Sequence, residues 1–204
     1  MRGWLCCLGV FALGCVSDEE GIDGNGDVVD PDRVDPACHG APLAPVTCAP
    51  SLAREHPSAG AGHIAWPTPI HYIETPPSSG DHRPEWGRWG EYSFLPPQRW
   101  LHNLEHGGVA LLYDPCLDAA LVEALRAFAR ARPDDDGGPF RWVLTPYPGL
   151  PAPVMAVAWQ WTWLAQCLSD ERLAELESFV TDHYRQSPED FDGDGSFSDG
   201  WLGK

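Results

Sequence analysis

The sequence has few basic side chains and no motif that names a reaction. Its 204 residues carry 13 Lys and Arg against 30 Asp and Glu, so the formal net charge is -17. This charge argues against nucleic acid as a partner, because a polyanion would be repelled, and against loose attraction to anionic lipid head groups. A Gly-rich phosphate loop, a nucleophile elbow, a Cys-x-x-Cys motif and internal repeats are all missing from the sequence.

The composition is that of a globular protein. Apolar residues make up 43% of the chain and aromatic residues 11%, with ten Trp. The length suits one domain with flanking segments and is sufficient to bury a core. We therefore expect a single domain in which aromatic packing is prominent.

The first fifteen residues have the pattern of an export signal. Arg2 precedes an apolar run from Trp4 to Leu13, which is shorter than the roughly 20 residues that a membrane-spanning helix needs. Residues 1–14 are therefore interpreted as a secretory signal peptide. The stretch from Ala12 to Cys15 resembles the lipobox of bacterial lipoproteins, in which the cysteine is lipidated, although that family more often has Leu where Ala12 stands. The alternative is cleavage by an ordinary signal peptidase, which would leave a soluble periplasmic or secreted protein.

The count of cysteines supports lipidation of Cys15. Two of the seven cysteines would leave with the signal peptide, and a lipid on Cys15 leaves an even number, as expected for disulfides in an oxidising compartment. The remaining four are Cys38, Cys48, Cys116 and Cys167. Four cysteines allow three pairings, and proximity in the sequence favours Cys38 with Cys48 and Cys116 with Cys167. Since no Asp follows Cys15, the outer membrane is favoured over the inner membrane.

Charge and composition divide the exported chain into three parts. Residues 15–36 are rich in Asp, Glu and Gly with little to bury, which predicts a disordered tether behind the lipid anchor. Residues 37–190 are expected to form the globular domain, and residues 191–204 a flexible acidic tail. The run Asp190-x-Asp192-x-Asp194-Gly matches half of a calcium loop, but its twelfth position is Trp201 instead of Glu. We therefore favour a solvated tail over a calcium site.

Hydrophobic periodicity predicts an α+β fold: a small mixed sheet with two covering helices behind a long, irregular, aromatic-rich N-terminal loop region. The apolar run 109–113 and the segment 141–145 are typical of strands, and 153–163 also favours a strand. Helices are expected over 117–132 and from Ser169, a favourable N-cap, to a point before Pro188.

Three motifs stand close together ahead of the first predicted strand. They are Pro-Pro-Ser-Ser-Gly-Asp-His at 76–82, Trp-Gly-Arg-Trp-Gly-Glu-Tyr at 86–92 and His-Asn-Leu-Glu-His-Gly-Gly-Val at 102–109. Here the chain resembles a bacterial family catalogued as domain of unknown function 3105, from about residue 63 to 189. The resemblance implies no activity, but it directs attention to these positions.

The histidines of these motifs are candidate metal ligands. His102 and His106 share a face on a helix or a strand, Glu105 could add a carboxylate, and His82 could fold back from its turn. Three imidazoles with an open fourth position would suit zinc or copper, and Met155 could add a soft ligand to a cuprous ion. The alternative is that the histidines only hydrogen-bond loop backbone.

Two further interpretations remain open. Residues 102–106 match the H-x-x-E-H pattern of a zinc-dependent hydrolase, but Gly107-Gly108 argues against the long helix that such a site requires. A ligand- or protein-binding module is a different class of function, with Trp86, Trp89 and Trp100 lining an aromatic cleft. The sequence thus predicts a cell-envelope domain that binds either a transition metal or another ligand.

Overall fold

The computed structural model describes residues 30–43 and 47–204. The expected signal peptide, the lipidation site Cys15 and most of the acidic tether lie outside the described residues, and the body from Pro31 to Lys204 is one compact unit. Among the helices of the described part, none combines the length and the apolar character needed to cross a membrane.

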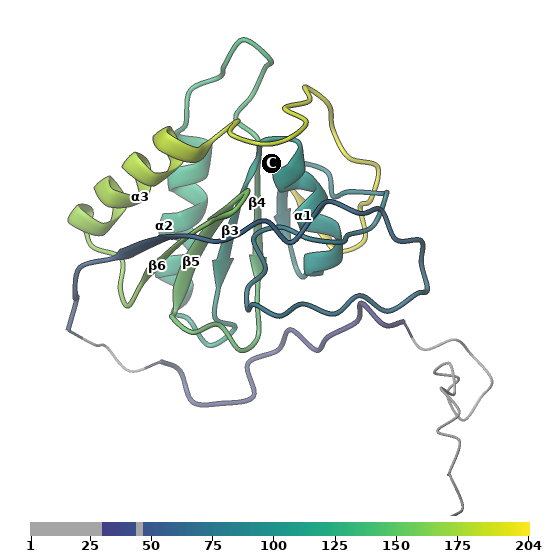
Figure 1. The fold of residues 1–204 in the computed structure, drawn as a ribbon. Helices are drawn as coiled ribbons and strands as arrows, with labels where there is room; N and C mark the ends of the chain where they lie inside the picture. The colour runs from purple at the N-terminus through teal and green to yellow at the C-terminus, as the bar shows by residue number, and fades with distance from the viewer. Residues whose placement is uncertain (1–29, 44–46) are drawn as a thin grey trace, which may run out of the picture. The chain divides into compact units, whose positions relative to one another are not determined.

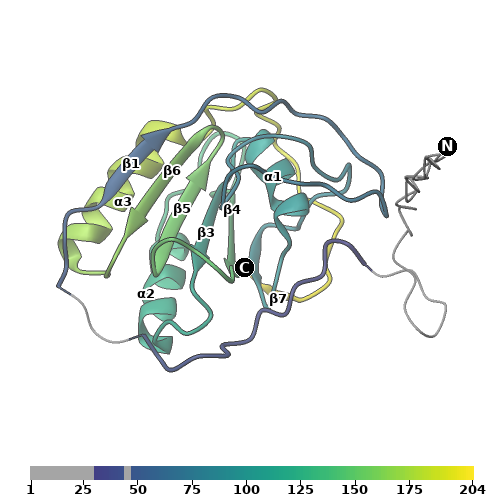
Figure 2. The same cartoon turned by 60° about the horizontal axis from the view of Figure 1, so that its bottom comes forward.

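A seven-stranded mixed sheet forms the centre of the fold. Its strands are β1 (Leu52–Glu55), β2 (Gly90–Tyr92), β3 (Val109–Tyr113), β4 (Trp142–Pro146), β5 (Val154–Ala158), β6 (Trp161–Ala165) and β7 (Trp201–Gly203). Their order is β1-β6-β5-β3-β4-β2-β7, with β4 parallel to both β3 and β2 and the other pairs antiparallel. Figure 2 shows β1 and β7 at opposite edges of the sheet.

Three helices cover the two faces of the sheet. They are α1 (Pro97–Glu105), α2 (Ala119–Arg130) and α3 (Asp170–His183). The helices α2 and α3 lie on one face and α1 lies on the other (Figure 1). The side chain of Asp118 caps α2, and Ser169 caps α3 by accepting a hydrogen bond from the amide of Arg172. Such a cap satisfies one of the backbone N–H groups that a helix start leaves without a partner.

Alternation along β3 divides the core into two halves. Val109 and Leu111 pack towards α2 and α3, whereas Ala110 and Leu112 pack towards α1. All four are buried because the strand is central and both of its faces are covered. This explains why the strand is a continuous apolar run in the sequence rather than an alternating one. The second half of the core is the platform on which α1 is fixed.

The α+β class, the mixed sheet and the helices α2 and α3 are confirmed, but two elements differ from the expectation. The segment 153–163 forms two strands, because a tight turn at Trp159 and Gln160, where Gln160 has φ 64°, folds β5 onto β6. The helix α1 was not predicted. It begins in the loop region that was expected to be irregular and continues past the end of that region. Pro97 suits its first turn, because proline lacks only an N–H that would be unpaired there, and Gly107, with φ +82°, follows its end.

Both ends of the expected globular region extend further than predicted. Asp32, assigned to the disordered tether, is 4% exposed and forms an ion pair with buried Arg83, at 2.7 Å from Nε and 2.5 Å from Nη2. The segment 191–204 is not a free tail, since its strand β7 pairs with β2. A buried guanidinium requires a counter-charge, which draws the acidic segment onto the domain.

The disulfide pairing predicted from sequence proximity is wrong. Cys38 pairs with Cys116 and Cys48 pairs with Cys167, with Cα–Cα distances of 4.8 and 5.4 Å. The bridges therefore close loops of 78 and 119 residues and attach the irregular N-terminal region to the ends of core elements. Two disulfides are typical of proteins exported to an oxidising environment.

Candidate metal centre

The helix α1 presents two of the candidate ligands on one face. His102 and Glu105 are three residues apart, so they are neighbours on the helix surface. Both are buried, at 3% exposed each. The distance between His102 Nε2 and the nearer carboxylate oxygen of Glu105 is 3.9 Å. The two ligands that the helix supplies are therefore three residues apart, His102 and Glu105, whereas the sequence suggested the pair His102 and His106, four residues apart.

A second part of the site comes from two chain segments that run side by side. Backbone hydrogen bonds join Gly80 to Gly60, and His82 to Gly62 and Ile64, each at 2.8 Å, so His63 and His82 form a parallel bridge. The amide of the next residue, Arg83, donates to the carbonyl of Gln98 in α1. This paired segment therefore carries His63 and His82 to the same place beside the helix.

Four side chains converge at this place: His63, His82, His102 and Glu105. One ligand atom from each lies within 4.8 Å of all the others. A single oxygen of Glu105, Oε2, lies 3.4 Å from His63 Nε2 and 3.0 Å from His82 Nε2. Ligand atoms about 2.1 Å from a tetrahedral ion lie about 3.4 Å from one another. The group could therefore hold one metal ion with only small side-chain adjustments.

Backbone carbonyls fix the orientation of the two buried histidines. His82 Nδ1 lies 2.8 Å from the carbonyl of Gly80, and His102 Nδ1 lies 2.8 Å from the carbonyl of Arg83. A carbonyl only accepts, so each Nδ1 carries the proton and each Nε2 presents a lone pair to the cluster. Metal-ligating histidines usually have this support, because the outer hydrogen bond sets both the tautomer and the ring orientation.

Burial keeps these imidazoles uncharged. It lowers the pKa of His102 to about 3, and the neighbouring histidines act in the same direction. It also lowers the pKa of His82, although Glu105 and the carbonyl of Gly80 oppose the change. Neutral imidazole is the form that binds a metal. The cluster therefore does not need to lose protons from these two rings at neutral pH.

His106, the other predicted ligand, lies outside the converging group. It occupies the C-cap of α1, and its ring packs against Trp86 and Phe191, with ring centroids 4.6 and 5.3 Å away. Its Nδ1 lies 3.9 Å from a carboxylate oxygen of Glu189. The H-x-x-E-H pattern is therefore helical up to Glu105, contrary to expectation, but only the first of its two histidines belongs to the converging group.

His63 was missed because nothing near it in the sequence marks it as a ligand. It lies 19 residues before His82 and 39 before His102, and only the folded chain brings the three together. The one available signal is the resemblance to the family, which begins at about this residue. A ligand supplied by tertiary contact alone is invisible to spacing arguments.

Two features predicted from the sequence are not seen in the fold: Met155 does not lie at the cluster as a soft ligand, and the three tryptophans do not line an aromatic cleft. Met155 is 2% exposed and packs in the core, and Trp100 is fully buried there. Trp89 is also a core residue, and only Trp86 of the three tryptophans is partly exposed. The ring of Trp86 packs against that of His102 in a tilted arrangement, with ring centroids 4.7 Å apart. Trp86 therefore packs against the histidines, whereas Trp89 and Trp100 belong to the core, and the three do not line an open cleft.

The half calcium loop at the C-terminal end is occupied by protein groups. Asp190 binds Arg141 at 2.7 Å and Arg185 at 3.0 Å, and Asp194 accepts a hydrogen bond from the amide of Trp89 at 2.8 Å. These contacts attach the segment to the domain. They also explain why it is ordered despite its charge.

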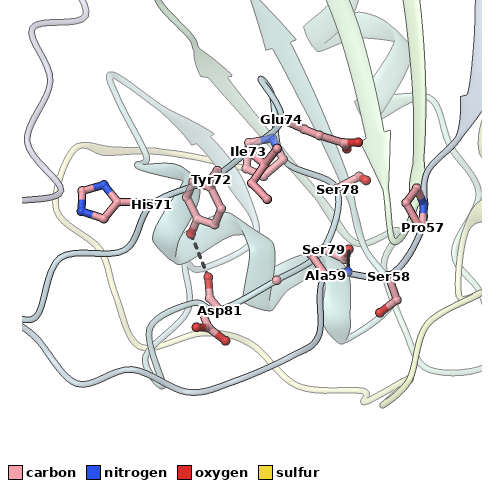
Figure 3. Close-up of a pocket in the computed structure, with 12 residues that line it drawn as sticks. Pro57, Ser58, Ala59, His71, Tyr72, Ile73, Glu74, Ser78, Ser79 and Asp81 are labelled. Carbon is pink, nitrogen blue, oxygen red and sulfur yellow. Dashed lines mark hydrogen bonds between the residues drawn. The ribbon is translucent and has the colours of Figure 1, made fainter.

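A cavity of about 400 Å³ lies beside the loop that supports His82. Figure 3 shows the hydroxyl of Tyr72 donating to the carbonyl of Asp81, at 2.9 Å. Glu74, on another part of the wall, is paired with His56 at 2.7 Å. Gly80, whose carbonyl orients His82, is also part of this wall. The cavity and the candidate metal centre therefore share one structural loop.

The fold and the site together define a mixed α+β domain with a histidine–glutamate cluster that could hold a metal ion. The family model described as protein of unknown function (DUF3105) matches residues 63–194. This is more than half of the chain, which therefore belongs to that family. The match begins at His63 and includes all four candidate ligands. Neither a curated protein nor a solved structure matches the chain.

Proposed function

We propose that this protein is a metal-binding module of the cell envelope, with His63, His82, His102 and Glu105 as the ligands of one divalent ion. It is attached to the membrane through a lipid on Cys15. The two disulfides agree with an exported protein. The cluster supports the binding function, and the lipobox-like sequence supports the anchor.

The observation that carries the proposal is the contact between His82 and Glu105. Because Nδ1 of His82 donates to a carbonyl, its Nε2 lone pair faces Glu105 Oε2 at 3.0 Å. His102 and His63 direct Nε2 at the same oxygen. Lone pairs that converge on a carboxylate repel one another unless a cation or a proton lies between them. Burial disfavours protonation of His82, and a proton on Glu105 could bridge to only one of the three rings, so a metal ion is the cation that fits best.

The ligand types favour zinc. Three imidazole nitrogens and one carboxylate oxygen are ligands that zinc accepts in tetrahedral geometry. Cuprous copper prefers sulfur, and the candidate soft ligand Met155 is in the core. Cupric copper binds most nitrogen and oxygen sites more tightly than zinc does, so it is the competitor to measure.

Metal analysis of the purified protein tests the proposal. We expect about one equivalent of zinc per chain, removable with a chelator and restored by titration. Zinc at about 100 times its dissociation constant should stabilise the fold by about 2.7 kcal/mol, which corresponds to roughly 5–11 °C in melting temperature for a domain of this size.

Variants separate the proposed ligands from their neighbours. His82→Ala and His102→Ala should lose stoichiometric zinc, and Glu105→Gln should bind it more weakly. His106→Phe is the matched control, because it keeps a ring against Trp86 but removes the other histidine of the motif. Wild-type protein that takes up neither zinc nor copper would overturn the proposal, as would loss of the metal in His106→Phe alone.

A further inference from the structure

The four ligands of the proposed site differ sharply in how they are held. The side chains of His82, His102 and Glu105 are 0%, 3% and 4% exposed, whereas that of His63 is 44% exposed. The buried histidines are each fixed by a backbone carbonyl. Three ligands therefore form a rigid base, and the fourth lies on the solvent side.

The main chain of His63 is nevertheless anchored. It pairs with His82, and the guanidinium of Arg83 donates from Nη1 to the carbonyls of Ile64 and Ala65, at 3.2 and 3.1 Å. The imidazole can therefore leave the cluster only by rotation about its own side-chain bonds. Exposed side chains change rotamer within picoseconds to nanoseconds, so this rotation is fast compared with any movement of the chain.

The other face of the cluster is closed. His102 packs against Trp86 and His106, with ring centroids 4.7 and 4.6 Å away, and His63 stacks over His102 from a centroid distance of 4.6 Å. Trp159 lies edge-on to His82. An incoming donor that approaches an ion in this cluster therefore meets His63 first.

From this asymmetry, and resting on the proposed metal site, we infer that the protein is a metal-transfer protein in which His63 is the exchangeable ligand. The partner is a molecule that offers a nitrogen donor of the imidazole type. Its nitrogen bonds to the ion while the bond between the ion and His63 Nε2 breaks. In this first step the ion would keep its charge and its other three ligands, so the step needs no redox partner, and His63 leaves as a neutral imidazole. Transfer is complete only when donors of the partner have also replaced His82, His102 and Glu105.

Cobalt(II) can test this inference, because its visible spectrum reports the ligands of a zinc-type site. In His63→Ala we expect cobalt to remain bound, with affinity reduced by at least about 10–100-fold, because loss of a group that merely supports a ligand already has that effect. Free imidazole should then shift the spectrum by filling the vacated position. His71→Ala is the matched control, since it removes an exposed histidine of the same loop region.

A second measurement uses the wild-type protein and does not depend on the folding of a variant. Imidazole titrated into the zinc form should return the ring resonances of His63 to their metal-free positions while those of His82 and His102 stay unchanged. The rate of zinc release to a chromophoric chelator should rise with imidazole concentration. Simultaneous release of all three rings, or a His63→Ala protein whose cobalt spectrum ignores imidazole, would refute the transfer role and leave metal binding standing. Wild-type protein that binds no metal would instead refute the proposed function.

Discussion

Mild acid is expected to destabilise the metal-free protein through His102. Burial lowers the pKa of this ring to about 3, whereas in the unfolded chain it titrates at about 6.5. At a pH between these two pKa values, the ring of His102 is protonated in the unfolded chain but neutral in the folded protein. The free energy of unfolding therefore falls as the pH falls below about 6.5 and is retained in full above it.

The size of this effect follows from the two pKa values. At 1.36 kcal/mol per pKa unit, the complete loss, reached below about pH 3, is about 5 kcal/mol. Between pH 7 and pH 5 the linkage relation gives a loss of about 2 kcal/mol. Burial lowers the pKa of His82 and of His106 as well, so these rings add to the loss. Domains are typically stable by only 5–15 kcal/mol, which makes the effect measurable.

Urea denaturation of the chelator-treated protein at pH 7, 6 and 5 measures this loss of unfolding free energy. The variant His102→Gln removes the titrating ring but keeps an N–H that can reach the carbonyl of Arg83, and we expect it to lose about 2 kcal/mol less than the wild type between pH 7 and 5. The pKa values of Asp135 and Asp190 are lowered, so their stabilisation is lost only below about pH 4 and stays outside this window. Equal losses in both proteins would refute the reasoning.

Three further predictions concern the stability of the fold and its disulfide bonds. Asp32→Ala should cost about 3–5 kcal/mol by leaving a buried guanidinium without its carboxylate, whereas exposed Asp35→Ala should stay within about 0.5 kcal/mol; urea titration compares the two. Peptide mapping without reductant should recover Cys38 joined to Cys116. A peptide that joins Cys38 to Cys48 would contradict the fold. Ser169→Ala should cost about 1 kcal/mol by removing the cap of α3, and an unchanged denaturation midpoint would show that the cap contributes nothing.

The elements that sequence reasoning located are those whose signal is local. The strand β3 is a buried apolar run between Gly107-Gly108 and Asp114, and α3 starts at a capping serine and continues with an apolar stripe. Each can be recognised from its own residues, because burial and capping act within one element. The same is true of α2, which begins two residues later than expected and ends two residues earlier.

The elements that were missed depend on distant partners. Most of α1 is buried, including the polar side chains of Gln98, Asn103 and Glu105, so its polar residues have partners inside the protein that the sequence alone does not reveal. The side-chain amide of Asn103, for example, forms hydrogen bonds with the backbone of Gly87, at 2.7 and 3.0 Å. The disulfides follow the same rule, since each joins segments at least 78 residues apart.

The ligand set combines both kinds of information. His102 and Glu105 come from one helical turn, which a motif of five residues can suggest, but the end of α1 at Glu105 turns His106 towards Trp86 and out of the set. His63 takes its place in the ligand set, because Arg83 anchors the segment that carries His63. The buried guanidinium of Arg83 donates to the carbonyls of Ile64, Ala65 and Thr68, in the segment that follows His63, and Asp32 neutralises it. A charge that sequence reasoning assigned to a free tether thus helps to hold the exposed ligand at the site, so loss of Asp32 should weaken metal binding as well as stability.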